Sequence, residues 1–140
     1  MNFLAKTAAP APFKSDAEWR RQLTPEQYHV TREHGRERAF SGPYWDETAE
    51  GLYSCVCCGS SVFSSEAKFD SSTGWPSFFA AVSRHAVYEY HDRMTRRTGV
   101  HCSICDAHLG HVFRDGPQPT GLRYCVNGTA LKFEPKVETK

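Results

Sequence analysis

Polar and hydrophobic positions divide the chain into a short helical beginning and a longer β-rich part. Segments 15–18 (SDAE) and 24–27 (TPEQ) each match a capping box, with a hydroxyl residue at the N-cap and Glu or Gln at the third helical position. In the second box a proline occupies the favoured first helical position. We therefore predict helices over residues 15–23 and 24–34, the second ending at Gly35.

From about Phe40 onward, short segments rich in Val, Phe, Tyr and Thr are separated by Gly, Pro, Asp and Ser. Residues 87–91 and 122–126 alternate between polar and hydrophobic side chains with a period of two, which indicates strands. Residues 115–119 (DGPQP) are typical of a turn or loop. The sequence predicts a mainly β fold of antiparallel strands, preceded by short helices.

Length and composition are those of one globular domain. The Ala- and Pro-rich residues 1–14 predict a flexible lead, and residues 15–140 a single domain. The net charge of +1 provides no field for nucleic acid or an anionic membrane. No segment approaches the roughly 20 apolar residues that cross a bilayer, and none resembles a signal peptide. We therefore expect a cytoplasmic protein that binds neither nucleic acid nor membrane.

Four of the six cysteines form two Cys-x-x-Cys pairs, Cys55/Cys58 and Cys102/Cys105. In a reducing compartment such pairs indicate metal or redox chemistry more often than a disulfide framework. Two thiolate pairs brought together give the tetrahedral site that a structural zinc ion prefers. We predict one structural Zn²⁺ per chain, which clamps two distant parts of the β domain.

Two other ligand sets are compatible with the spacing. Cys57 could replace Cys58, although Cys-x-x-Cys is the more usual geometry. His108 and His111 could complete a local Cys2His2 site with the pair that ends at Cys105. Four ligands so close along the chain would have to fold around one ion without hydrophobic support, which favours the four-cysteine site.

The sixth cysteine and two histidines form a second candidate site. His108 and His111 can face one cavity if Gly110 relaxes the backbone between them. The loop that follows is suited to return the chain antiparallel, so that Cys125 lies beside the histidine segment. A thiol and a nearby base are the components of nucleophilic catalysis.

The neighbours of Cys125 favour a functional thiol. A free cysteine is often only a small buried hydrophobe. Here Arg123 and Asn127 are expected on the same strand face. A guanidinium stabilises a thiolate, and an amide can donate hydrogen bonds to a developing charge.

Several long motifs resemble the B-type peptide-methionine (R)-S-oxide reductases, from about Asp16 to Phe133. The motifs are GWPSF at 74–78, the Cys-x-x-His-Leu-Gly-His-Val-Phe run at 105–113, DGP at 115–117, GLRYCVN at 121–127 and ALKF at 130–133. The resemblance implies two antiparallel sheets in a barrel- or tent-like domain, with the zinc site away from the chemistry. It also implies reduction of the R epimer of methionine sulfoxide, with oxidised proteins as substrates and the free amino acid as a further candidate.

The resemblance also implies residue roles. Cys125 is the nucleophile that attacks the sulfoxide sulfur, which releases methionine and leaves a sulfenic acid. His108 and His111 orient the sulfoxide oxygen and help to supply its proton. Arg123 and Asn127 support the thiolate.

Two aromatic residues are the expected substrate contacts. Trp75 corresponds to the tryptophan that receives the S-methyl group, with Phe113 beside it. Phe133 either lines the same pocket or fills the core, and Asp115 is a candidate to orient a polar partner.

This chain departs from the family pattern at one position. Thr73 stands where many members carry a resolving cysteine. Cys57 is the spare thiol and an alternative resolver, but it adjoins an expected zinc ligand, where packing would hold it far from Cys125. We therefore expect thioredoxin or a small thiol to reduce the sulfenic acid directly. We also expect the protein to be a monomer. The main alternatives are a zinc-stabilised binding module without catalysis, and a zinc hydrolase with His108 and His111 as ligands.

Overall fold

The computed structural model describes residues 14–136, so the predicted lead lies outside the described residues except for Lys14. The helices and strands in this part of the chain are α1 (Asp16–Gln22), α2 (Pro25–Arg32), β1 (Gly51–Cys55), β2 (Ser61–Ser64), β3 (Lys68–Phe69), β4 (Ser77–Phe78), β5 (Val87–Asp92), β6 (Arg97–Cys102), β7 (His108–Phe113), β8 (Arg123–Val126) and β9 (Leu131–Pro135). Short 3-10 turns, η1 (Ser65–Ala67) and η2 (Gly128–Ala130), precede β3 and β9. None of the helices in the described residues is long and apolar enough to cross a membrane.

Both helices begin as predicted, because both capping boxes are formed. The end of α2 differs from the prediction. The helix stops at Arg32, and His34 rather than glycine takes the left-handed conformation, with φ at 59°. A Cβ at Gly35 would contact the ring of His29, which packs against this glycine. The backbone N–H of Gly35 donates to the carbonyl of His29 at 2.8 Å and closes the helix end.

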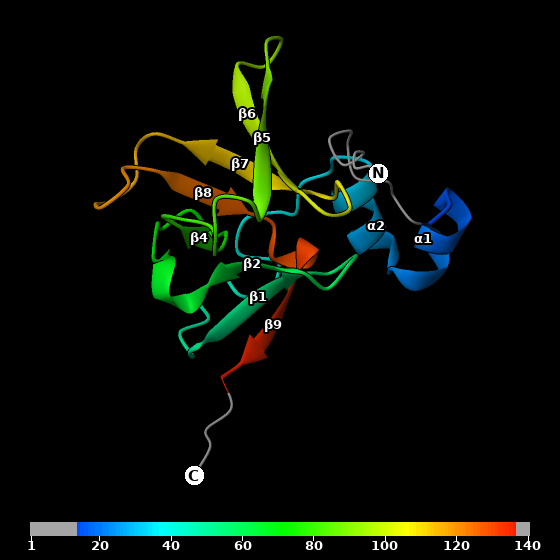
Figure 1. Cartoon of the computed structure of the whole chain (residues 1–140), viewed down its shortest axis with the longest axis horizontal. Helices are drawn as coiled ribbons and strands as arrows, with labels where there is room; N and C mark the ends of the chain where they lie inside the picture. Colours follow the sequence, from blue (N-terminus) through cyan, green and yellow to red (C-terminus); the bar gives the residue numbers. More distant parts are fainter. Residues whose placement is uncertain (1–13, 137–140) are drawn as a thin grey trace, which may run out of the picture.

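The strands form two antiparallel sheets, as predicted. One sheet has the order β2-β1-β9, and the other has the order β3-β4-β8-β7-β6-β5. The β5–β6 hairpin projects from the rest of the molecule (Figure 1). Within residues 14–136 the sheets do not close into a barrel, so that part of the predicted architecture is wrong. The loop between β7 and β8 returns the chain antiparallel, as the DGPQP segment predicted.

An aromatic core joins the two sheets. Phe63 of β2 stacks on Phe78 of β4 with ring centroids 4.5 Å apart, and Tyr53 of β1 contacts the same ring edge-on at 5.1 Å. All three side chains are fully buried. Phe133 packs 4.7 Å from Tyr53, so it belongs to this core. Burial of several aromatic side chains supplies the main hydrophobic stabilisation of the sheet pair.

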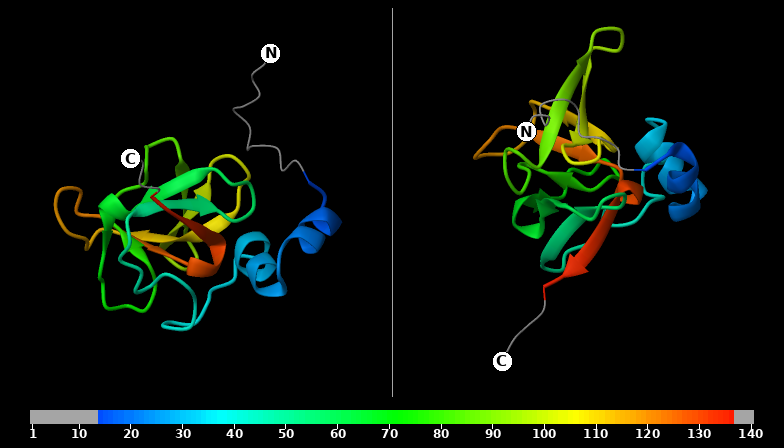
Figure 2. Two further views of the ribbon diagram at one scale, coloured as in Figure 1. Left: turned by 90° about the horizontal axis from the view of Figure 1, so that it is seen from below. Right: turned by 45° about the vertical axis from the view of Figure 1, so that its right-hand side comes forward.

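The two helices lie together at one side of the sheets (Figure 2). They hold the turns that carry the paired cysteines. Gln22 at the end of α1 donates to the carbonyl of Cys57, and Arg32 at the end of α2 donates to the carbonyl of Cys105, both at 2.8 Å.

Candidate active site and metal-binding group

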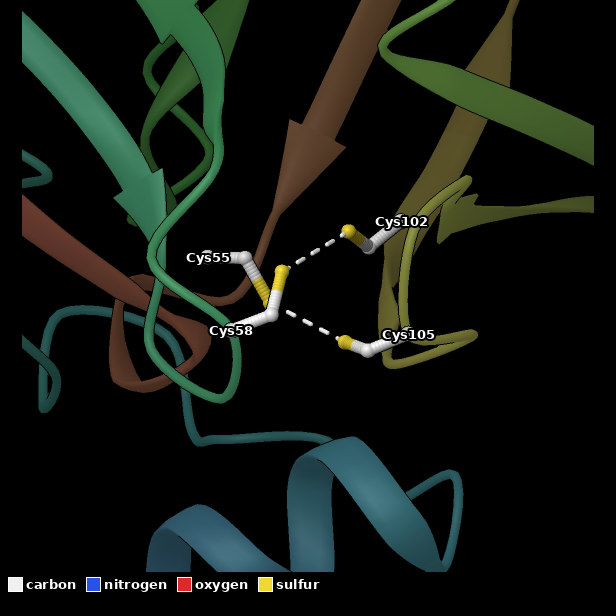
Figure 3. A group of neighbouring side chains, drawn as sticks. All are labelled: Cys55, Cys58, Cys102 and Cys105. Carbon is white, nitrogen blue, oxygen red and sulfur yellow. Dashed lines mark hydrogen bonds between the residues drawn. The ribbon is translucent and has the colours of Figure 1, made fainter. Parts of the chain in front are cut away.

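The four paired cysteines come together where the two sheets meet (Figure 3). Cys55 ends β1 and Cys58 lies in the turn that follows, while Cys102 ends β6 and Cys105 lies in the turn to β7. The sulfur atoms of Cys55 and Cys105 are 3.6 Å apart, as are those of Cys58 and Cys102. All four sulfur atoms lie within 4.8 Å of one another.

This geometry fits a tetrahedral metal ion. Zinc–sulfur bonds of about 2.3 Å in a tetrahedron place the sulfur atoms about 3.8 Å apart. Among the described residues, this is the set of His, Cys, Asp or Glu side chains close enough to share an ion, and it includes Cys58 rather than Cys57. The local alternative with His108 and His111 as ligands is therefore wrong. These four cysteines are positioned to bind a metal ion.

A β-bulge directs the two histidines into one cavity. Val100 pairs with Gly110 but His101 pairs with His108, so Leu109 is an extra residue in β7. The extra residue shifts the alternation of side chains, and the rings of His108 and His111 lie 5.4 Å apart. The bulge, rather than a flexible glycine, brings these imidazoles together.

Gly110 has a different role, which concerns the neighbouring strand. A Cβ at this position would lie 2.2 Å from the carbonyl oxygen of Cys125. The absence of a side chain therefore allows β8 to approach β7 closely. In the resulting register His111 lies directly opposite Cys125, and Ser77 of β4 lies opposite Cys125 on its other side.

A cavity of about 330 Å³ opens over this face of the sheet. All seven residues predicted for the chemistry and the substrate line it: Trp75, His108, His111, Phe113, Arg123, Cys125 and Asn127. None of the four metal-group cysteines lines it, so the metal group lies outside the cavity, as the sequence analysis predicted.

Burial lowers the pKa of His108 and of His111. The pKa of His108 falls to about 3, first because its ring is desolvated and then because His101 and His34 lie nearby. The pKa of His111 is lowered by burial and by the charge of Arg36. Both imidazoles are therefore neutral near neutral pH. The Nδ1 atom of His108 is buried without a hydrogen-bond partner in the described residues, so it is free to bond a ligand or water.

The surroundings of Cys125 act on its thiol in opposite directions. Burial raises the pKa of Cys125, and this effect exceeds the opposing effects of the Thr73 hydroxyl, Arg123 and Arg36. Arg123 forms a bidentate ion pair with Asp115 at 2.9 and 3.0 Å, so Asp115 is placed to hold this guanidinium. Arg123 favours the thiolate of Cys125, as expected, but burial outweighs this effect and the net shift of the Cys125 pKa is upward.

Asn127 lines the cavity, but its side chain is already bonded to the backbone. Its amide nitrogen donates to the carbonyl of Leu109 at 3.0 Å, and its amide oxygen accepts from the backbone N–H of Glu37 at 2.9 Å. The amide therefore ties the bulge of β7 to the connection after α2. Glu37 also accepts the indole N–H of Trp75 on its backbone carbonyl at 3.0 Å.

Sequence reasoning missed four residues at this site. His34, Arg36 and Arg97 line the cavity, and Glu37 bonds two of the residues that do. His34 stacks on His108 with ring centroids 5.0 Å apart. The second predicted helix ends within this region, at Gly35, but that signal concerns the backbone only. No local motif marks these side chains.

Comparison with known proteins identifies the family. The SelR domain model matches residues 23–135, which is most of the chain. The chain belongs to the SelR domain family. The match contains the whole cavity and all four metal-group cysteines, whereas all of α1 precedes it.

Relatives of this SelR domain protein share its length as well as its sequence. A protein from Agrobacterium fabrum named peptide methionine sulfoxide reductase MsrB is 54% identical to this chain. The match covers 94% of this chain and 99% of the relative. Two proteins of the same name, from Thiobacillus denitrificans and Hahella chejuensis, are each 58% identical. The first match covers 88% of this chain and 95% of the relative, and the second covers 86% of this chain and 88% of the relative. The resemblance to B-type reductases stated above is confirmed.

Proposed function

We propose that this SelR domain protein is a peptide-methionine (R)-S-oxide reductase, which converts the R epimer of methionine sulfoxide to methionine. One arrangement carries the proposal. Cys125 lies opposite His111 in a cavity that Trp75 also lines. The cavity thus combines a nucleophile, polar groups for an oxygen atom and an aromatic surface for a methyl group. The alternative of a binding module without catalysis leaves this combination without a task.

In the proposed reaction the sulfur of Cys125 attacks the sulfoxide sulfur. The attack forms an S–S bond while the sulfoxide oxygen takes a proton. Transfer of this hydroxyl to the sulfur of Cys125 then breaks both the S–O bond and the S–S bond of the adduct, so that methionine leaves and Cys125 remains as a sulfenic acid. The thiol loses one proton and the oxygen gains one, so no external acid is consumed. Because burial raises the pKa of Cys125, the thiol retains its proton until substrate enters.

The neutral histidines suit this proton transfer. A neutral imidazole can donate a hydrogen bond from one nitrogen and accept one at the other. His111 lies opposite the thiol, and His108 has an unpartnered buried nitrogen in the same cavity. We assign them the orientation of the sulfoxide oxygen and the transfer of the thiol proton to it. Arg123, two residues before Cys125, and Asn127, two residues after it, support this arrangement.

Trp75 and Phe113 form the proposed contact with the substrate methyl and side chain. Both are half-buried at the cavity, and the indole is fixed in orientation by its bond to the carbonyl of Glu37. A methyl group next to a polarised sulfur packs well against an aromatic face.

We further propose that the metal is zinc and that its role is structural. Four cysteine ligands leave no open coordination position, so the ion contributes no chemistry to the cavity. Its four ligands would be Cys55, Cys58, Cys102 and Cys105, one pair from each sheet. Loss of the ion would release the two turns that the helices also contact.

Regeneration of Cys125 is proposed to use an external thiol, thioredoxin or a small molecule. Thr73 occupies the position next to the reacting sulfur, with its Oγ1 atom 3.9 Å from the Sγ atom of Cys125. Two thiols would then convert the sulfenic acid to the thiol, with one disulfide and one water as products. We propose oxidised proteins as substrates, residues 15–140 as one catalytic domain, a monomeric state and a cytoplasmic location.

Mass spectrometry of Cys125 after a single turnover tests the proposal. The protein is mixed with the R or the S epimer of an N-acetylated methionine sulfoxide amide, in the presence of a sulfenic acid trap. We expect one trapped adduct at Cys125 and one equivalent of methionine product with the R epimer only. Equal reaction of both epimers, or product without modification of Cys125, would contradict the proposal. Cys57→Ser serves as a control that retains Cys125.

A further inference from the structure

The mouth of the cavity carries an excess of positive charge. Arg36, Arg97 and Arg123 line it, and no Asp or Glu side chain of the described residues does. A cavity lined by one sign of charge attracts ligands of the opposite sign.

Two of the three arginines remain available to a ligand. The charge of Arg123 is compensated by Asp115. Within residues 14–136, neither Arg36 nor Arg97 forms an ion pair, and both side chains are exposed. They are therefore the cations that an incoming molecule would meet.

The nearest acidic residue along the sheet does not neutralise Arg97. Asp92 of β5 lies opposite Arg97 in the strand register. Its carboxylate instead accepts the backbone N–H groups of Met94 and Thr95, at 2.9 and 3.5 Å, and so caps the turn of the hairpin. The charge of Arg97, which lines the cavity, is therefore not compensated by Asp92.

The two arginines reach the reacting centre from different elements. Arg97 begins β6 and shares a face with Gly99, which lies opposite His111. Arg36 comes from the connection after α2, and its guanidinium lies 5.5 Å from the ring of Trp75. Both charges act at His111, whose pKa they lower together with burial. A peptide bound across the cavity would thus have a cation within reach of more than one of its residues.

We propose that Arg36 and Arg97 select methionine sulfoxide residues that have Asp or Glu beside them in an extended polypeptide. This inference rests on the proposed function and names its substrate class. The cavity of about 330 Å³ accommodates the sulfoxide side chain, so its neighbours must remain at the mouth. Consecutive residues of an extended chain are about 3.3–3.6 Å apart, which keeps their carboxylates within range of an arginine. Each exposed ion pair between such a carboxylate and an arginine strengthens peptide binding by roughly 1.5- to 5-fold.

The test compares peptides that differ only beside the sulfoxide. Three peptides, N-acetylated and C-amidated, carry Glu, Gln or Lys on both sides of R-methionine sulfoxide, and kcat/KM is measured with dithiothreitol as reductant. We expect the order Glu, Gln, Lys, with Glu about 3- to 10-fold above Gln. Raising the salt concentration to about 1 M, where the Debye length is about 3 Å, should abolish most of this difference.

Variants then locate the preference. The measured quantity is the ratio of kcat/KM for the Glu and Gln peptides, which does not depend on the fraction of enzyme that is folded. Arg36→Gln and Arg97→Gln should each reduce the ratio, and the double variant should bring it near one. Arg93→Gln, in the turn of the β5–β6 hairpin and outside the cavity, removes the same charge and should keep the ratio.

The outcomes separate this inference from the proposed function. If the wild-type protein reduces none of the three peptides, the proposed function fails. If it reduces the Gln peptide but shows no preference for Glu, the selection of acidic neighbours is refuted while the reductase stands. A preference that persists in the double variant would equally refute the role of Arg36 and Arg97.

Discussion

The backbone carbonyl of Glu37 accepts the indole N–H of Trp75 at 3.0 Å, so the orientation of this cavity aromatic depends on a buried glutamate. The side chain of the same glutamate accepts the backbone N–H groups of Gly128 and Thr129, at 2.9 and 2.7 Å. Its own N–H donates to Asn127. Glu37 thereby fixes the connection after α2 to residues 127–129, which follow β8.

The first prediction concerns this glutamate. Glu37→Gln replaces one carboxylate oxygen with an N–H donor that faces backbone donors, so we expect the free energy of unfolding to fall by about 1–3 kcal/mol. We expect kcat/KM for a methionine sulfoxide peptide to fall about 10- to 100-fold, because Trp75 and Asn127 lose their alignment. Glu66→Gln, on the surface, is the matched control. Unchanged kinetics in Glu37→Gln would contradict the positioning role.

The second prediction concerns the missing resolving thiol. Thr73→Cys places a sulfur beside Cys125, so a single turnover should end in an intramolecular disulfide and thioredoxin-dependent turnover should rise. Titration of free thiols before and after one turnover measures the disulfide. Thr73→Ser keeps a hydroxyl at this position, so one turnover should remove only the free thiol of Cys125 from the titration. If Thr73→Cys behaves like Thr73→Ser, the position is too distant or misdirected for a disulfide.

The third prediction separates two adjacent cysteines. Cys58→Ser removes a ligand of the four-cysteine group and should abolish bound metal, with a large loss of thermal stability. Cys57→Ser should retain one metal ion per chain and most turnover, at a stability cost of about 1 kcal/mol for a buried hydroxyl. Elemental analysis and thermal unfolding provide the measurements. The reverse pattern would show that Cys57 is the ligand.

The fourth prediction follows from the pKa of His108, which is about 3 in the folded protein and 6.5 as its ordinary value. The unfolded chain therefore binds a proton that the folded protein excludes between these values. The contribution of the neutral His108 ring to the free energy of unfolding is fully present above about pH 6.5. It is lost as the pH falls towards 3, at up to about 1.4 kcal/mol per pH unit.

His108→Gln should remove this part of the pH dependence. Chemical denaturation at several values between about pH 7 and 5 measures the slope for the wild type and the variant. His85→Gln removes an exposed histidine and should leave the slope unchanged. A slope in His108→Gln that equals the wild-type slope would show that another group causes the pH dependence.

Local signals in the sequence predicted the parts of the fold that depend on local interactions. The capping boxes at 15–18 and 24–27 form within four residues, so both helix starts are confirmed. The pair Cys55 and Cys58 is likewise set by a single turn. A period of two was sufficient to recognise the strand that carries Cys125.

The remaining features depend on contacts between distant residues. The contact between Glu37 and Asn127 spans 90 positions, and no pattern near either residue indicates it. The bulge at Leu109 exists only because β7 pairs with β6 in a shifted register. Arg97 likewise reaches the cavity through the pairing of β6 with β7, which the sequence of β6 alone does not reveal.

The four-cysteine group has a consequence for the proposed catalytic cycle, which runs on external thiols. A metal ion bound there would cross-link the turn after β1 to the turn after β6, as a disulfide could. A disulfide there would be open to exchange with the same reductants that regenerate Cys125. A zinc–thiolate cross-link could not be reduced by a thiol, because its sulfur atoms are already thiolates and zinc has no redox chemistry in proteins. With the proposed zinc ion bound, the two sheets would stay joined under conditions reducing enough for the proposed cycle.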